Sequence, residues 1–483
     1  MEQRISTLGG EPGTGYNAAM MPPVSLSDYQ RREDDGSRWS RYQRYLDFFN
    51  GRQWDSRPRP GERRLTVNYA RVFVHKLASY LVGKGVTVAL EPNGSDAAAA
   101  DAAQQAEAFL RQVWADNSLQ LLDFDTAIDS AVLGDGAFKV SLQEGASLAL
   151  DFGLPVVGAA KNSASSASSV IRVAACDVMG LSARWRGDDM RRLLAVTESY
   201  RLAQTEAAEL FGKAAVVAAA GSWQPGQLVT ISEVWDEASF CLKLNSRVVR
   251  EQANPYGFIP YVIFPNQRRP RQFWGESDLV DVMALNSELN ARVSVLSQIL
   301  QMSGNPILVL ENVDEAEGLR VGPGAVWTLP ENSKAYLLDL LKDGGLDLHI
   351  KYIEALYRVL HDLSEMPRTS FGDNQSGAAR SVVALEMMLQ PLVQKILRKR
   401  QIWSEVIERR NRMILALAGL PLHRSRIEWP DILPKDRQAL VTNEVALVGA
   451  GIHSREAAAR PLGDERPDQL VAQVLAEAAR FGK

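Results

Sequence analysis

The feature that most constrains the fold is one long helical pattern near the end of the chain. From Val382 to Leu417, apolar residues are spaced like the a and d positions of a heptad repeat. A continuous α-helix over this range would be about 54 Å long. Pro391 lies inside the pattern and removes one backbone donor, so we expect a kink there. A helix of this length needs a large surface to pack on, which predicts several packed modules rather than one small domain.

Two further amphipathic helices are predicted upstream, separated by a segment with strand and turn signals. Between Glu276 and Met302, apolar residues recur every three or four positions, which is the helical period. A second helix is expected from Leu346 to Leu363, after short strands at Ile307–Leu310 and Ala325–Leu329. The following stretch, Thr369–Ala379, contains two glycines and one large apolar residue, and it predicts a mobile loop. Two helices are therefore expected to flank a small β insertion.

The first half of the chain predicts a mixed α and β region. Met1–Asp35 has no periodicity and is expected to be a loosely held arm, and Lys161–Ser169 a flexible loop. Helices are expected at Trp39–Phe49, Val67–Val82, Ala97–Asn117 and Leu119–Leu133. Strands are expected at Val86–Leu90, Ala137–Leu142, Ile171–Ala175, Leu193–Tyr200, Val229–Trp235, Phe240–Leu244 and Tyr261–Phe264. The fold class indicated by this mixture is α+β.

Composition narrows the class of protein. The 483 residues carry a formal net charge of −4, which argues against a protein that coats nucleic acid, because neutralising phosphates needs an excess of Lys and Arg. The two cysteines, Cys176 and Cys241, are too few for a disulfide framework, so we expect buried free thiols. No apolar run is long enough to span a bilayer, and Met1–Ala18 lacks a signal-peptide pattern. We therefore expect neither secretion by a signal peptide nor a membrane-spanning segment.

Motifs for common catalytic chemistry are missing from the sequence. No glycine-rich phosphate loop ending in Lys and Ser or Thr is present, so a nucleotide-driven motor is not expected. The five histidines form no HxxxH or HExxH pair, and the GxSxG and post-strand GxGxxG motifs are also absent. Acidic residues on the two flanking helices leave one catalytic alternative, a two-metal nuclease. Their spread over several turns is more simply explained by a solvated acidic face.

Several short motifs occur in a recognisable order along most of the chain. They are Tyr45–Gly51, Asn68–Arg71, Gly83–Gly85, Pro265–Asn266, Gly275–Leu279, Leu285–Asn290, Phe371–Gly372, Ser376–Ala379 and Gly451–Glu456. In this order and spacing the chain resembles the portal proteins of tailed bacteriophages, and most closely the Bacillus-phage type found at a siphophage capsid vertex. The segment between Leu148 and Ser222 carries none of these motifs.

The resemblance implies a particular α+β architecture. Such subunits have wing, stem, clip and crown parts and assemble, usually as twelve copies, into a ring with an axial channel for double-stranded DNA. Applied to this chain, the parts are an N-terminal arm (1–35), a wing (36–274), a first stem helix (275–304), a clip (305–341), a second stem helix (342–368), a tunnel loop (369–381), a long wing helix (382–420) and a crown (421–483). In such phages the packaging ATPase is a separate terminase, which agrees with the missing phosphate loop. The implied location is the capsid vertex of the virion, after assembly in the bacterial host cytoplasm.

The resemblance also implies three sets of functional residues. The tunnel loop would touch DNA through weak polar contacts of Asn374, Gln375, Ser376, Gly377 and Arg380. Channel-lining acids would come from the two stem helices, namely Glu276, Asp278, Asp281, Glu288, Asp347 and Glu354. The clip would present a docking surface that contains Glu311, Asp314, Glu315, Glu317 and Arg320. A negative channel makes physical sense because DNA has to slide through without its phosphates being held at fixed sites.

The expected partners follow from this assignment. They are further copies of the chain, double-stranded DNA in transit without sequence specificity, the terminase large subunit, a head-completion adaptor, and capsid or scaffolding proteins, with no membrane and no cofactor. We expect the basic residues of the long helix to form ion pairs between subunits rather than DNA contacts; they are Arg398, Lys399, Arg400, Arg409, Arg410 and Arg412. The alternatives are a metal-dependent nuclease that uses the helix carboxylates, and another structural component of a phage head or baseplate.

Overall fold

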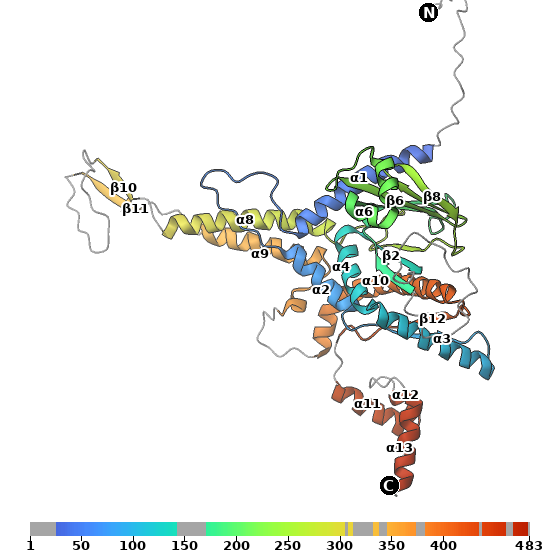
Figure 1. Ribbon diagram of the computed structural model, residues 1–483. Coiled ribbons are helices and arrows are strands. Elements are labelled where there is room, and N and C mark those ends of the chain that lie inside the picture. Colours follow the sequence, from blue (N-terminus) through green and yellow to red (C-terminus); the bar gives the residue numbers. More distant parts are fainter. Residues whose placement is uncertain are drawn as a thin grey trace, which may run out of the picture.

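The computed structural model describes residues 26–142, 171–304, 308–312, 332–337, 345–372, 382–433, 437–459 and 467–481. It contains a mixed helix-and-sheet body from which a pair of long helices projects, with a small β-hairpin beyond their far end (Figure 1). The predicted α+β class is therefore confirmed. No helix among the described residues is long and apolar enough to cross a membrane.

The centre of the body is a three-stranded antiparallel sheet covered by the long helix. Strand β2 (Asp135–Leu142) lies between β3 (Ile171–Ala175) and β9 (Tyr261–Pro265). Helix α10 (Val382–Leu417) packs on this sheet, and its Trp403 ring meets the edges of Phe138 and Phe264 with centroids 6.2 and 5.2 Å apart. The surface that a helix of this length requires is thus the main core of the body.

Four helices from the first part of the chain complete this core. They are α1 (Leu26–Phe49), α2 (Tyr69–Val82), α3 (Ala97–Asp116) and α4 (Leu119–Leu133). Asn68 caps the N-terminus of α2, since its side chain accepts a hydrogen bond from the backbone of Arg71, and the apolar face of the helix is buried. A segment from near the C-terminus also belongs to the body: β12 (Arg424–Glu428) pairs antiparallel with β1 (Thr87–Glu91).

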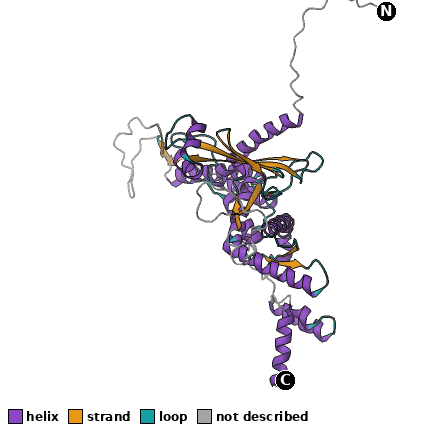
Figure 2. Cartoon of the chain, turned by 45° about the vertical axis from the view of Figure 1, so that its right-hand side comes forward, coloured by secondary structure: helices purple, strands orange, loops and turns teal. Residues whose placement is uncertain are grey.

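A second module is a five-stranded antiparallel meander with its own small core. Its strands are β4 (Leu181–Trp185), β5 (Leu193–Ala203), β6 (Leu228–Asp236), β7 (Ser239–Leu244) and β8 (Arg247–Ala253), joined in that order. The short helices α6 (Gln204–Phe211) and α7 (Lys213–Ala220) contribute to a separate cluster around Ala207, Val216, Val229 and Leu244. Figure 2 shows that most strands gather in the upper part of the molecule.

The projecting pair consists of α8 (Val280–Gly304) and α9 (Gly345–Leu363), which lie side by side and run in opposite directions (Figure 1). We call these two helices the stem. The hairpin of β10 (Leu308–Glu311) and β11 (Lys334–Leu337) lies beyond its far end. Three C-terminal helices, α11 (Arg437–Gly449), α12 (Arg455–Ala459) and α13 (Pro467–Phe481), lie apart from the strands at the other side of the body (Figure 2).

Most predicted elements are present, and the long helix has the predicted bounds. Two predictions of boundaries are wrong: α1 already begins at Leu26, inside the expected arm, and α8 begins at Val280 rather than Glu276. Six strands and helices were not predicted, namely β4, β8, β11, β12, α6 and α7. The segments Lys161–Ser169 and Ala325–Leu329 lie outside the described residues. Cys176 and Cys241 are free and only partly buried.

Candidate functional site

The base of the stem is held to α10 by a buried charge cluster. The Asp278 carboxylate, just before α8, lies 2.6 Å from the ammonium of Lys399 and 3.1 Å from that of Lys395. Asn266 and Gln267 donate further hydrogen bonds to the same carboxylate. Burial opposes ionisation, but the two lysines outweigh it and lower the pKa of Asp278. The stem therefore begins from a fixed ionic anchor inside the body.

This geometry corrects two of the predicted channel acids. The side chain of Asp278 is only 2% exposed in the single chain and cannot line an open channel. Glu276 also precedes α8, so it does not belong to a stem helix. Its carboxylate lies 3.6 Å from the guanidinium of Arg269. Gly275 is required beside them because a Cβ there would collide with the carbonyl oxygen of Gly134. The Gly275–Leu279 motif is thus a buried junction between the body and the stem, which we call the joint.

A second buried carboxylate stabilises the same joint. Asp135, at the start of β2, accepts hydrogen bonds from the Tyr42 hydroxyl and from the backbone of Gly275, the latter at 2.7 Å. Burial raises the pKa of Asp135 to about 6, although these hydrogen bonds and nearby Arg38 favour the charged form. The joint therefore contains two carboxyl groups whose pKa values are shifted in opposite directions.

The Leu285–Asn290 motif supplies a row of amides that docks an irregular segment onto α8. Asn286 accepts a hydrogen bond from the backbone of Ala70 and donates one to the carbonyl of Val67. One turn later, Asn290 accepts from the backbone of Val67 at 2.8 Å. Gln53 accepts from both asparagine side chains. The motif was recognised in the sequence, but its docking role was not predicted. The i, i+4 spacing of Asn286 and Asn290, which places both side chains on one face of the helix, is the signal that could have suggested it.

The remaining predicted channel acids lie on the stem. Asp281 and Glu354 are exposed, whereas Glu288 pairs with Arg292 and Asp347 with Lys351, each one helical turn apart at 2.6 Å. The two helices together carry five acidic residues (Asp281, Glu288, Asp347, Glu354, Asp362) and three basic ones (Arg292, Lys351, Arg358). The stem surface is therefore mildly acidic rather than strongly so.

The stem also exposes large apolar side chains on both helices. On α8 these are Val280, Val295, Leu300 and Met302, and on α9 they are Leu348, Ile350, Tyr352, Val359 and Leu363. Leu348 is the extreme case, with 72% of its surface exposed. Several exposed large apolar side chains on two neighbouring helices are typical of a protein–protein interface.

Most residues predicted for the tunnel loop and the clip lie outside the described part of the chain. Asn374, Gln375, Ser376, Gly377 and Arg380, and likewise Asp314, Glu315, Glu317 and Arg320, lie outside the described residues. Glu311 is exposed on β10, where its carboxylate accepts a hydrogen bond from Tyr336 at 2.9 Å. The loop predicted at Thr369–Ala379 is wrong for its first residues, because Arg368–Phe371 form a short 3-10 helix and the Phe371 ring packs edge-on against Phe73 and His361.

The basic residues of α10 mostly pair within the chain, which corrects the expectation of ion pairs between subunits. Arg410 is fully buried and binds both oxygens of Asp123. Arg398 pairs with Glu365, and Arg409 with Glu405, both at 2.7 Å. Arg400 donates to the carbonyl of Pro430. Intrachain contacts thus account for at least five of the six, including Lys399 at the stem base.

Within the described part of the chain, no group of three or more His, Cys, Asp or Glu side chains is arranged to hold a metal ion. The nuclease alternative therefore gains no support from the geometry of the helix acids.

A comparison with protein families identifies the class of protein. The family model for phage portal proteins of the SPP1 Gp6-like type matches residues 222–481. The matched range runs from just before β6 through the stem, the hairpin, α10 and the C-terminal helices. The chain belongs to this family of phage portal proteins. No curated protein matches the sequence.

Membership defines the role at a coarse level. A portal protein is a structural component of the bacteriophage capsid vertex that serves DNA packaging, and the family implies a homo-oligomeric ring. The stem, with its exposed acidic and apolar side chains, is the part of the chain most relevant to this role.

Proposed function

We propose that copies of the chain, twelve as is usual for such proteins, form a closed ring. The stems of the ring surround an axial channel for packaging and ejection of double-stranded DNA. The observation that carries this proposal is the exposed apolar surface on both stem helices, which a neighbouring stem would bury. The chain has no ATPase role in this proposal, because a separate terminase supplies the energy.

The experiment is a mass measurement of the purified full-length chain across a concentration series, with class averages by electron microscopy. A ring with a central hole is the expected result. A stable monomer at high concentration would overturn the proposal. Incubation with duplex DNA and a divalent metal, followed by gel analysis, tests the nuclease alternative, and the DNA should stay intact.

The channel is proposed to be lined by the exposed stem acids. Asp281 and Glu354 carry this part of the proposal, because Glu288 and Asp347 are already paired with neighbouring basic residues. Replacing both with lysine should slow DNA packaging, since fixed positive charges would retain phosphates. Packaging at the wild-type rate by rings of normal size would contradict a lining role.

The tunnel loop is proposed to contact DNA through Asn374, Gln375, Ser376, Gly377 and Arg380. Deletion of Gly372–Gly377 should impair packaging or retention of DNA while rings still form. Particles with unaltered DNA content would refute this role.

The clip is proposed to dock terminase during packaging and a head-completion adaptor afterwards. The β10–β11 hairpin lies beyond the far end of the stem, away from the body, where a partner can reach it (Figure 1). Reversal of the clip charges Glu311, Asp314, Glu315, Glu317 and Arg320 should weaken both complexes. Unchanged affinity for both partners would sink the docking role. Contacts with capsid or scaffolding proteins, and assembly in the host cytoplasm, complete the proposal.

A further inference from the structure

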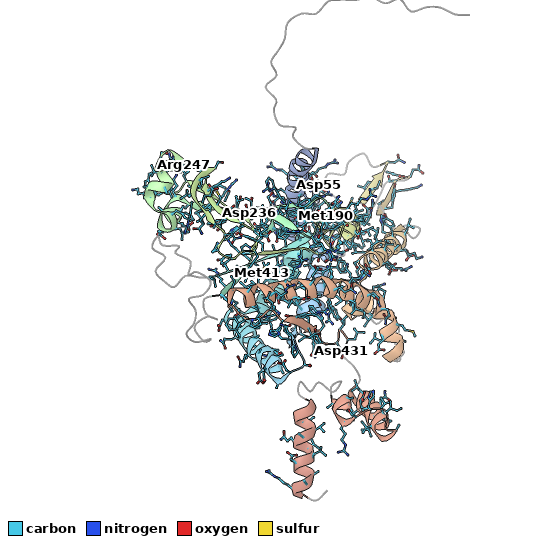
Figure 3. All side chains as sticks on the ribbon, turned by 90° about the vertical axis from the view of Figure 1, so that its right-hand side faces the viewer. Asp55, Met190, Asp236, Arg247, Met413 and Asp431 are labelled. Carbon is cyan, nitrogen blue, oxygen red and sulfur yellow. The ribbon has the colours of Figure 1, made fainter. Side chains whose placement is uncertain are left out.

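A basic pocket of about 420 Å³ lies beside the middle of α10. Its walls come from three separate parts of the chain: the turn between β4 and β5, the segment after β9, and α10 itself. Five of its residues are basic, namely Arg191, Arg268, Lys395, Arg398 and Lys399, against one acid, Glu405. Met190, next to Arg191, is labelled above the α10 ribbon in Figure 3.

The floor of the pocket is formed by the two lysines that hold Asp278. The Lys399 ammonium donates to Asn266 at 2.5 Å and to Asp278 at 2.6 Å. The Lys395 ammonium donates to the carbonyl of Ser364 at 3.0 Å and pairs with the same Asp278 carboxylate. An ammonium has three N–H donors, so each lysine retains one donor beyond these contacts. The two ammonium groups share the single carboxylate of Asp278, so one of their two positive charges is not neutralised.

The rim of the pocket adds further uncompensated charge. Glu405 is paired with Arg409, and Arg398 with Glu365, so these two pairs are close to neutral. Arg191 and Arg268 are exposed, and neither takes part in a salt bridge among the described residues. Together with the lysine excess, three positive charges face a pocket whose nearby carboxylates are already engaged.

We propose that this pocket binds a phosphate group. A single carboxylate would neutralise only one of the three charges, whereas a phosphate offers up to two negative charges and oxygens on several sides. Arginines at the rim and lysine donors at the floor suit that geometry. The pKa of Lys399 is lowered by burial and by its neighbour Lys395, which is the electrostatic cost that a bound anion would relieve. The phosphate could be a free anion or part of a DNA backbone, and the experiment separates these sources.

The test is calorimetric titration of the full-length chain with inorganic phosphate at constant ionic strength. The pocket variant is Arg191→Ala with Arg268→Ala, because both side chains are exposed and their loss leaves Asp278 paired. The control is Arg172→Ala with Arg201→Ala, which removes the same charge from exposed positions on β3 and β5, outside the pocket. Phosphate should bind saturably to the wild type, at least about tenfold more weakly to the pocket variant, and about equally to the control.

The proposal is overturned if the wild type shows no saturable phosphate binding at millimolar concentration, or if the pocket and control variants lose the same affinity. A short duplex DNA is then added as a competitor. If it displaces phosphate from the wild type and binds the pocket variant more weakly, the source is DNA. If phosphate stays bound in the presence of the duplex, the site takes a free anion.

Discussion

The body and the stem differ in how far their charged and apolar side chains are buried. In the body, the ion pair of Asp123 and Arg410 is buried and matched within one chain. In the stem, ion pairs such as Asp347–Lys351 are solvent-exposed, and Leu348 is left largely uncovered. The difference indicates that the body matches some of its buried charges within a single chain, whereas the exposed apolar residues of the stem leave surface for neighbouring copies.

The largest effect is expected from breaking a buried pair in the body. Arg410→Met leaves the Asp123 carboxylate, whose side chain is 4% exposed, without its partner. We expect a loss of about 3–5 kcal/mol in the free energy of unfolding, because a buried unpaired charge is costly. Urea unfolding followed by tryptophan fluorescence measures it. The adjacent Arg409→Met is the control, since its partly exposed pair is worth at most about 1 kcal/mol. Equal losses would break the contrast.

An apolar stem residue should matter to assembly more than to the fold of one chain. Leu348→Glu is expected to weaken ring association by about 1.5–3 kcal/mol per interface, because an apolar side chain loses its burial against a neighbour. The free energy of unfolding should change by less than about 0.5 kcal/mol. Mass measurement against concentration tests the first expectation, with exposed Val248→Glu on β8 as the control. Assembly that is unaffected by Leu348→Glu would exclude this face from the ring contact.

Buried Asp135 should give the body a measurable pH dependence. Its folded pKa of about 6 exceeds the unfolded value near 3.9, so the folded state binds more protons between these values. This group therefore makes the chain less stable as pH rises, by about 1 kcal/mol between pH 5 and 7. Asp278 acts in the opposite sense, because its lowered pKa stabilises the fold until acid protonates it. Unfolding of wild type and Asp135→Asn at both pH values measures the difference. A parallel pH response in the two proteins would contradict the raised pKa.

The smallest effect is expected from an exposed pair in the stem. Lys351→Met removes one partner of Asp347, and both side chains are more than half exposed. The free energy of unfolding should change by no more than about 0.5 kcal/mol, because solvent screens such helical pairs. A loss comparable to that of Arg410→Met would show that the stem is not different from the body.

Helical periodicity was the most reliable guide that the sequence offered. The long pattern gave the bounds of α10 because its apolar residues face one continuous core. Strand β8 was missed because most of its residues are exposed and its turn is formed by Asn245 and Ser246, both with positive φ, rather than by a glycine. Similarly, the short helix α7 is rich in alanine and lacks a clear apolar stripe.

The candidate site was harder to predict because long-range pairing decides it. Asp278 was expected in a channel, but its partners Lys395 and Lys399 are more than a hundred residues later in the chain. No local pattern distinguishes it from Asp281, three residues away, which is exposed. Arg410 was misassigned for the same reason, since its partner Asp123 lies in a helix of the first half.

The pairing of β1 with β12 has a consequence for how the chain folds. Residue 87 meets residue 428, and α10 covers a sheet whose first strand begins at residue 135. During synthesis the whole stem leaves the ribosome before α10 and β12 do. The apolar face of the central sheet therefore stays exposed until α10 has been synthesised. Contacts of such high sequence separation slow folding and expose the intermediate to aggregation. Nascent chains arrested before α10 should therefore depend on chaperones, whereas chains released after β12 should not.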